Sequence, residues 1–369
     1  MATPRRLQEW FPWTASPIVC NGPMFGAASP ALATEVTKAG GIGFLASVFD
    51  LSPNSPQLDK LDAELREART LLGDDNDDGG DLLGVGVSVI TGHGSVSHFA
   101  STTLPILARH RPAAVWLFAP AEHVKPHGAI IAAVRRELGD PGHGGPRVFV
   151  QVGNVAAARE AVRDGADVLV CQGVDAGGHQ FTRGAGVVSL VPEVRRMLAE
   201  EEEEEAGGLP GRGGVAILAA GGIADETGVA AAMALGAEGV VMGTRFTVAK
   251  ESIYPDFRKK IVLETSDGGA TTLKSTFNDR INDSPLWRPP YDGRAIVTAI
   301  HERFLAGASL EDCQRSLKED YAAEDSAKLI GTWAGTGVGL VRTAQAAGDI
   351  VREVREGAKE QIRRLAASL

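Results

Sequence analysis

Eight short apolar segments alternate with longer, alanine-rich segments along the first two thirds of this chain of 369 residues. In each short segment the apolar residues follow one another instead of alternating with polar ones. Continuous apolar runs are typical of parallel strands that are buried on both faces. The predicted strands are residues 17–20, 42–46, 82–89, 114–118, 147–152, 167–171, 215–219 and 239–242.

The segments between the predicted strands carry helix signals. Ser29 followed by Pro30 predicts an N-cap and a first helical residue, and the pattern VAAAREAVRDGA predicts a helix that ends near Gly165. Eight β-then-α units in succession favour a (β/α)8 TIM barrel, an α/β fold, over an open doubly wound sheet. In such a barrel the catalytic and binding residues follow the carboxyl ends of the strands.

The alternation of strands and helices stops after residue 250. Residues 251–333 contain DSPLWRPPYDGR and then charged helical patterns, so we expect a second, smaller, mainly helical domain there. Residues 334–369 begin with a glycine turn and continue as a helix. We expect this last segment to return to the barrel domain that residues 1–250 form.

Net charge and cysteine content argue against several classes of protein. The formal net charge of −10 argues against a nucleic-acid partner or an anionic membrane surface. No apolar run approaches the roughly 18 residues of a membrane span, and the first residues lack the apolar core of a secretory signal. The three cysteines are far apart and include no CxxC pair, which argues against a zinc site or a disulfide framework. We therefore expect a cytoplasmic protein without a metal. The formation of a homo-oligomer is left as a possibility.

Two acidic segments stand out. Six consecutive glutamates, residues 200–205, predict a solvated helix end followed by a loop. The segment DDNDDGGD, residues 74–81, fits the first half of a calcium loop, but Val85 stands where the bidentate glutamate belongs. Calcium binding is therefore not expected.

Glycine turns after the seventh and eighth predicted strands indicate a phosphate site. They lie in AAGGIAD, residues 219–225, and GVVMGTRF, residues 239–246. In TIM barrels these two loops often hold a phosphate, because backbone N–H groups and a helix N-terminus point toward it. Gly221, Gly222, Gly243 and Thr244 would surround the phosphate, with a further hydrogen bond from the Thr244 hydroxyl. The alternative is a pair of tight turns without a ligand.

A single histidine and a methionine loop complete the candidate site. The segment CQGVDAGGHQ places His179 in a glycine loop after the sixth predicted strand, where an imidazole suits proton abstraction near neutral pH. His123 and His127 are four residues apart, but Pro126 between them spoils a helical metal site. In NGPMFGAAS, after the first strand, Met24 could lie against a flat ring. The alternatives are a solvated histidine and a plain βα loop.

Together these motifs resemble the nitronate monooxygenases, formerly called 2-nitropropane dioxygenases. The matching segments are NGPMFGAASPALATEVTKAGGIGFLA, LGVGVS, VFVQVGNV, DVLVCQGVDAGGHQ, ILAAGGIAD and VMGTRF, with WAGTGVGL near the end. They keep the family's order and cover most of residues 17–246. The resemblance implies an FMN-dependent enzyme with a (β/α)8 barrel and a smaller helical domain that closes over the flavin.

The resemblance also implies roles for individual residues. His179 matches the family's catalytic base. Asp175 and Gln180 stand where glutamate, and arginine or glycine, are common in the family, which bears on substrate preference. The expected flavin contacts are Asn21, Gly22, Pro23, Met24, Ser88, Gln151, Gly178, Gly221, Gly222, Gly243 and Thr244, the last four on the phosphate.

The implied reaction is the oxidation of alkyl nitronates, and of nitroalkanes that His179 deprotonates, with O2 to carbonyl compounds and nitrite. Two other interpretations stay open for the same barrel. One is an FMN-dependent reduction of a quinone or an enoyl thioester by NAD(P)H. The other is a module that binds flavin or phosphate without catalysis.

Overall fold

The computed structural model describes residues 6–73, 82–205, 214–284 and 286–368. Its main sheet is parallel, in the order β1-β9-β8-β6-β5-β4-β3-β2. A parallel bridge between Cys20 and Ile42 joins the two ends of this order, so that the sheet closes into a barrel. The strands are β1 (Ile18–Asn21), β2 (Gly43–Val48), β3 (Leu83–Ile90), β4 (Pro112–Phe118), β5 (Arg147–Val152), β6 (Val168–Gln172), β8 (Ala216–Ala220) and β9 (Gly239–Met242). All eight predicted strands are confirmed.

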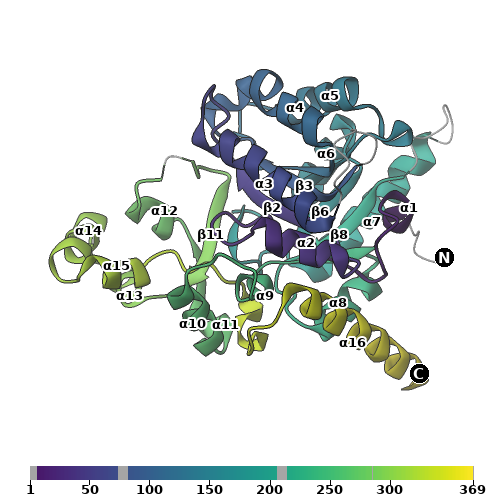
Figure 1. Ribbon diagram of the computed structural model, residues 1–369. Coiled ribbons are helices and arrows are strands. Elements are labelled where there is room, and N and C mark those ends of the chain that lie inside the picture. Colours follow the sequence, from purple (N-terminus) through teal and green to yellow (C-terminus); the bar gives the residue numbers. More distant parts are fainter. Residues whose placement is uncertain (1–5, 74–81, 206–213, 285, 369) are drawn as a thin grey trace.

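Helices cover the outside of the barrel (Figure 1). The two predicted caps are confirmed, because the Ser29 hydroxyl accepts a hydrogen bond from the N–H of Leu32 and Gly165 ends its helix in the left-handed conformation. The run of glutamates ends a helix, as predicted, whereas residues 74–81 lie outside the described residues. The helices are α2 (Pro30–Lys38), α3 (Pro56–Leu72), α4 (Phe99–His110), α5 (His127–Leu138), α6 (Val155–Asp164), α7 (Val187–Glu205) and α8 (Glu226–Leu235).

The eighth helix of the barrel comes from the end of the chain. After β9 and the short helix α9 (Thr244–Thr247), the chain leaves the barrel and returns as α16 (Ala347–Ser368). Helix α16 packs against α8 and α2, on either side of the gap that the missing eighth helix would leave (Figure 1).

The intervening chain forms a smaller layer beside the barrel (Figure 1). Its helices are α10 (Asp256–Glu264), α11 (Gly268–Thr271), α12 (Phe277–Ile281), α13 (Ala299–Leu305), α14 (Leu310–Glu319) and α15 (Ala323–Lys328). It also contributes β10 (Thr272–Ser275) and β11 (Tyr291–Ile296), which form an antiparallel sheet with β7 (Gly178–Phe181) in the order β10-β11-β7. The boundaries of the two domains stay a prediction.

The expected loop around His179 is a strand instead. His179 lies in β7 and is paired with Gly293 of β11. The sequence of β7, GHQF, carries no strand signal of its own. This strand is stabilised by its hydrogen-bonded pairing with β11, which is more than 100 residues away in the chain. The prediction of a glycine loop at this position is therefore wrong.

Aromatic side chains fill the barrel from its amino-terminal end up to Trp116, whose indole reaches the cavity described below. The ring centroids of Phe44, Trp116 and Phe149 lie 5.1 to 6.2 Å apart. Phe11, directly after α1 (Arg6–Trp10), adds its ring 6.0 Å from that of Phe149. Gly86 of β3 leaves room for this cluster, because a Cβ there would lie 2.3 Å from Cε1 of Phe44. The space for a ligand is therefore at the opposite end of the barrel.

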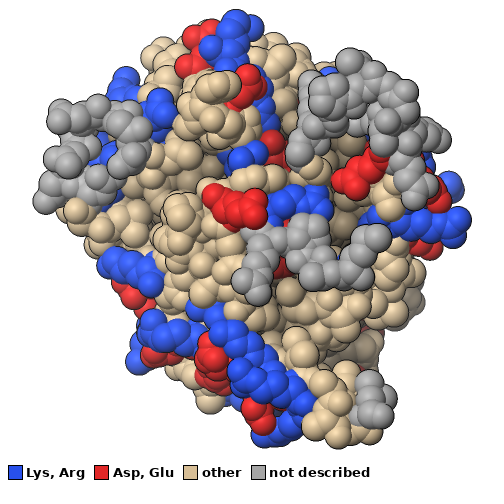
Figure 2. Space-filling model, turned by 90° about the vertical axis from the view of Figure 1, so that its right-hand side faces the viewer, with Lys and Arg blue, Asp and Glu red and all other residues tan. Residues whose placement is uncertain are grey.

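Charged side chains of both signs are mixed on the face that Figure 2 shows. Several form pairs along α16, for example Arg352 with Asp349 and Lys359 with Glu356. None of the described helices combines the length and apolar character needed to cross a membrane. Within the same residues, no group of three acidic, histidine or cysteine side chains could hold a metal ion.

Arg355 fastens α16 to the barrel, and its loss should weaken the fold. Its guanidinium is buried and donates to the carbonyls of Pro17, Ala39 and Gly40 at 3.2, 2.7 and 2.7 Å. We expect Arg355→Ala to destabilise the protein by about 3 kcal/mol or more, because buried carbonyls lose charged donors. The measurement is the midpoint of thermal unfolding.

The matched control is Arg352→Ala in the same helix. The Arg352 side chain is 59% exposed and pairs with Asp349 at the surface. Its removal should change stability by no more than about 0.5 kcal/mol. Equal midpoints for the two variants would contradict the role of Arg355.

Candidate active site

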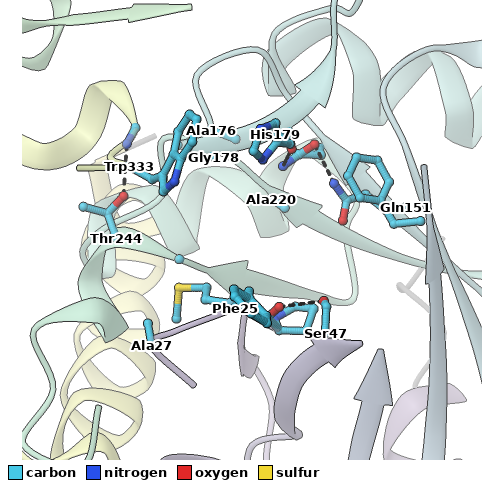
Figure 3. Close-up of a pocket in the computed structure, with 18 of the residues that line it drawn as sticks. Phe25, Ala27, Ser47, Gln151, Ala176, Gly178, His179, Ala220, Thr244 and Trp333 are labelled. Carbon is cyan, nitrogen blue, oxygen red and sulfur yellow. Dashed lines mark hydrogen bonds between the residues drawn. The ribbon is translucent and has the colours of Figure 1, made fainter. Parts of the chain in front are cut away.

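A cavity of about 560 Å³ opens at the carboxyl ends of the barrel strands. This volume lies within the range of about 300–1,000 Å³ that is usual for cofactor and substrate sites. Figure 3 shows His179 and Gln151 on one side of the cavity, and Phe25, Ala27 and Ser47 on the other. Eleven of the twelve predicted site residues line it: Gly22, Pro23, Met24, Ser88, Gln151, Gly178, His179, Gly221, Gly222, Gly243 and Thr244.

Asn21 is the predicted site residue that does not line the cavity. Its side chain is fully buried, donates to the carbonyls of Phe44 and Gly22 at 2.8 and 3.1 Å, and accepts from the Phe44 N–H at 2.9 Å. The amide therefore ties β1 to β2 below the loop that begins at Gly22. We expect Asn21 to hold this loop in place without touching a ligand through its side chain.

The turn after β8 requires its two glycines. Gly221 and Gly222 have φ values of +102° and +74°, which side chains with a Cβ rarely adopt. A Cβ on Gly221 would also lie 2.6 Å from the carbonyl oxygen of Gly173. The N–H of Gly222 makes no hydrogen bond with any described residue, so it can donate to a ligand in the cavity.

The N-terminus of helix α8, which follows the first glycine turn, already has a cap. Its N-terminus is capped by Asp225, whose carboxylate accepts from the Gly228 N–H at 2.9 Å. A negative charge already occupies the positive end of this helix. For an anion in the cavity we therefore expect contacts from the glycine turns and Thr244, and not from the end of α8.

The turn after β9 provides an open surface and a hydroxyl. A Cβ on Gly243 would meet nothing nearer than Met24 Sδ at 3.9 Å, so it would point into free space of the cavity. Thr244 Oγ1 accepts a hydrogen bond from the Gly335 N–H at 3.0 Å (Figure 3). This bond leaves the Thr244 hydroxyl hydrogen free to donate.

A chain of hydrogen bonds crosses one wall of the cavity. Trp116 Nε1 donates to Gln151 Oε1 at 3.2 Å, and Gln151 Nε2 donates to Gln172 Oε1 at 2.7 Å. Gln172 Nε2 in turn donates to the carbonyl of His179 at 3.2 Å. The role of Gln172 was not predicted, although it is the last residue of β6 and Gln151 is the last but one of β5, so the same rule could have found it.

His179 is held by side chains from the smaller layer. Its Nε2 lies 2.8 Å from Oδ1 of Asp279 in α12, and the two side chains are only 13% and 7% exposed. The imidazole stacks on Trp287 with ring centroids 3.6 Å apart and an angle of 6°. Trp333 covers it from a second direction at 4.6 Å and 51°. Sequence reasoning missed all three partners, because residues 251–333 show no repeating pattern that would place them.

Other titratable groups near the barrel have structural roles. Burial lowers the pKa of His127 to about 4, so its ring is neutral near pH 7. Its Nε2 lies 2.8 Å from Thr91 Oγ1 and is therefore already hydrogen-bonded. Burial raises the pKa of Cys171 to about 12, which keeps this thiol protonated. His93 lines the cavity, but its Nδ1 lies 2.7 Å from Ser95 Oγ within its own turn.

The mouth of the cavity is aromatic. Phe25 is 63% exposed and packs against Phe49 with ring centroids 5.7 Å apart.

Of the two positions that differ from the family pattern, Gln180 is buried and donates to the carbonyl of Ala176 at 2.7 Å. Neither Gln180 nor Asp175 is among the described residues that line the cavity.

Comparison with known proteins points to one family. The sequence model of the family described as Nitronate monooxygenase matches residues 142–357. A Nitronate monooxygenase of Neurospora crassa is 46% identical over 98% of this chain and 94% of its own length. Nitronate monooxygenase npaC of Metarhizium robertsii is 34% identical over 98% of this chain and 97% of its own. The fold is similar to a solved nitroalkane oxidase of Streptomyces ansochromogenes, with a TM-score of 0.69 at 23% identity, over 97% of this chain and 99% of that one.

Gly293 gives the His179 cluster its room, so Gly293→Ala should disturb the cluster. A Cβ there would lie 2.5 Å from Trp333 Cζ3 and 3.3 Å from His179 Cδ2. We expect a loss of about 1–3 kcal/mol from overpacking, measured as a lower midpoint of thermal unfolding.

The control is Gly269→Ala in α11, where the nearest heavy atom would be Asp267 Oδ1 at 3.5 Å. A helical glycine replaced by alanine should leave stability unchanged or raise it by up to about 1 kcal/mol. A Gly293→Ala variant as stable as this control would show that the cluster is looser than the contacts indicate.

Proposed function

Because this chain belongs to the nitronate monooxygenase family, we propose that it binds FMN in the barrel cavity and oxidises alkyl nitronates and nitroalkanes with O2 to carbonyl compounds and nitrite. The chain is an oxidoreductase by this membership. The observation that carries the proposal is that His179 and the two glycine turns face one cavity.

The residues of the cavity fit an FMN. The phosphate would be held by N–H groups of the turns at Gly221, Gly222 and Gly243 and by the Thr244 hydroxyl. Gly243 supports this assignment, because its missing side chain leaves free space at that point of the wall. A flat ring system would find few obstructing side chains beside Gly22 and Gly178, and Met24 offers it a polarizable contact.

Two further groups suit the polar edge of a flavin. Gln151 is fixed by Trp116 and Gln172, so its amide is oriented before any ligand binds. Ser88 Oγ lies 2.9 Å from the Ser47 hydroxyl at the wall formed by β2 and β3. Both side chains line the cavity and can exchange hydrogen bonds with ring nitrogen and carbonyl groups.

The mechanism divides the work between cofactor and protein. When bound, FMN would supply the electron transfer and the reaction with O2. His179 would remove the α-proton of a neutral nitroalkane as a general base. A nitronate already lacks this proton, so its oxidation depends on binding and orientation and not on a base. Trp287, Trp333 and Phe25 would keep water from the reacting carbon.

The proposal includes a small-molecule nitro compound as the substrate and the cytoplasm as the location of the protein. The three cysteines are free and buried, which supports a reducing, cytoplasmic environment. The formation of a homo-oligomer stays a prediction.

The purified protein should carry the visible absorbance of an oxidised flavin, and Gly243→Ala should reduce its flavin content. The added methyl group meets no protein atom closer than 3.9 Å, so the fold should persist while the ligand loses space. The measurement is the ratio of flavin to protein after purification, beside the thermal midpoint of the flavin-free form.

Gly142→Ala is the control, because a Cβ there has no heavy atom within 4 Å and Gly142 does not line the cavity. Equal flavin contents for the two variants would argue against the proposed place of the phosphate. Phosphate binding without any flavin would favour the module without catalysis.

His179→Ala should separate neutral and anionic substrates. We expect kcat/KM for nitroethane to fall by about 100-fold or more, because a general base contributes that much, whereas ethyl nitronate stays a substrate. Oxygen uptake measures both reactions. His123→Ala, at an exposed position, is the control.

Full activity of His179→Ala on nitroethane would overturn the assignment of the base. Rapid bleaching of the flavin by NADH without O2, combined with no oxidation of nitronates, would instead favour the quinone or enoyl-thioester reductase.

A further inference from the structure

We propose that Asp279 is a positioning residue that keeps a proton on His179 Nε2 and so leaves Nδ1 as the atom that accepts the substrate's proton. The Asp279 carboxylate oxygen Oδ1 lies 2.8 Å from Nε2. The effect of this arrangement on substrate deprotonation rests on the proposed function, whereas the position of the proton on the ring does not.

The hydrogen bond between the two side chains has one direction. An ionised carboxylate can only accept, so Nε2 must be the donor. A neutral imidazole carries a single N–H, and its other ring nitrogen then bears the lone pair. Nδ1 forms no hydrogen bond with any residue in the described ranges, while the ring lines the cavity. The basic nitrogen is therefore the one that remains for the substrate.

The neighbours of the ring also separate its two edges. A Cβ on Gly293 would lie 3.3 Å from Cδ2, the carbon next to Nε2, so β11 flanks the same edge as Asp279. Nδ1 belongs to the opposite edge. Trp287 lies parallel to the ring at 3.6 Å, and Trp333 covers it at 4.6 Å. These two indoles hold the ring plane, so that Nε2 cannot turn away from Asp279 without displacing them.

The second oxygen of Asp279 indicates that this carboxylate also stabilises a positive charge on the imidazole. Oδ2 is buried and has no hydrogen-bond partner among the described residues. A buried carboxylate with an unsatisfied oxygen is costly, and a positive charge next to it offsets part of that cost. The imidazolium that forms when His179 accepts a proton supplies this charge. Asp279 would thus favour the product of the proton transfer as well as the orientation of the base.

The pair also explains why the base requires the smaller layer. His179 comes from β7, whereas Asp279 comes from α12 and is 100 residues further along the chain. The barrel alone would present the imidazole without its carboxylate or the stacking indole of Trp287. Docking of residues 251–333 therefore completes the base.

The position of the proton can be measured directly by 15N NMR of the flavin-loaded protein with labelled histidine. A His179→Gln variant assigns the signal among the eight histidines. We expect the neutral ring to carry its hydrogen on Nε2 in the wild type. Asp279→Asn should lose this preference, because an amide can either donate or accept. A wild-type ring with its hydrogen on Nδ1 would overturn the proposal.

Kinetics on the same proteins test the consequence for catalysis. In Asp279→Asn we expect kcat/KM for nitroethane to fall by about tenfold or more, since the base loses its orientation and its counter-charge. The value for ethyl nitronate, which needs no base, should stay within about twofold. Equal losses for both substrates, or no loss for either, would overturn the role of Asp279.

Two further variants test whether the effects of Asp279→Asn come from a general loss of structure. Asp283→Asn removes an exposed carboxylate from the same segment and should change neither the tautomer nor either rate. Asp279→Glu keeps a carboxylate acceptor and should restore part of the nitroethane activity and the Nε2–H tautomer. Flavin content and the thermal midpoint are compared for all variants. If the wild type oxidised neither compound, the proposed function would fail. The position of the proton on the His179 ring would still test whether Asp279 holds it on Nε2.

Discussion

Closure of the parallel sheet is the constraint on which the rest of the structure depends. The ladder between β1 and β9, and the bridge from Cys20 to Ile42, complete the ring of strands. Closure gathers the carboxyl ends of all eight strands at one opening, so that residues far apart in the chain line a single cavity. The aromatic cluster of Phe11, Phe44 and Phe149 fills the interior below this opening, and Trp116 of the same cluster reaches the cavity. The described cavity therefore lies where the glycine turns and His179 meet.

The antiparallel pairing of β7 with β11 adds the second half of the site. It attaches residues 251–333 to the loop region of the sixth barrel strand and brings Asp279 and Trp287 against His179. The catalytic histidine that we propose thus sits where two parts of the chain meet. Its orientation depends on contacts from both, since the backbone is held by β11 and Gln172 and the ring by the smaller layer.

The electrostatic character of the cavity comes from backbone groups more than from charged side chains. Among the described residues that line it there is no lysine or arginine. A phosphate there would be bound by N–H groups of the turns at Gly221 and Gly243, which carry partial charges already fixed in direction. Among the described lining residues, Asp279 therefore faces His179 without a lysine or arginine beside it.

The sequence by itself determined the barrel, its eight strands and the glycine turns after the seventh and eighth predicted strands, because these features follow from local apolar runs and glycines. Ser88, Gln151 and Gly178 were expected from the family resemblance, and they line the same cavity. Tertiary structure alone decided what surrounds His179. Its strand exists only through pairing with Gly293, and Asp279, Trp287 and Trp333 come from a segment without periodicity. Asn21 shows the same limit, because burial and bonding to Phe44 decide its role. Contacts between residues distant in the chain leave no local pattern, and these contacts position the histidine that we propose as the base.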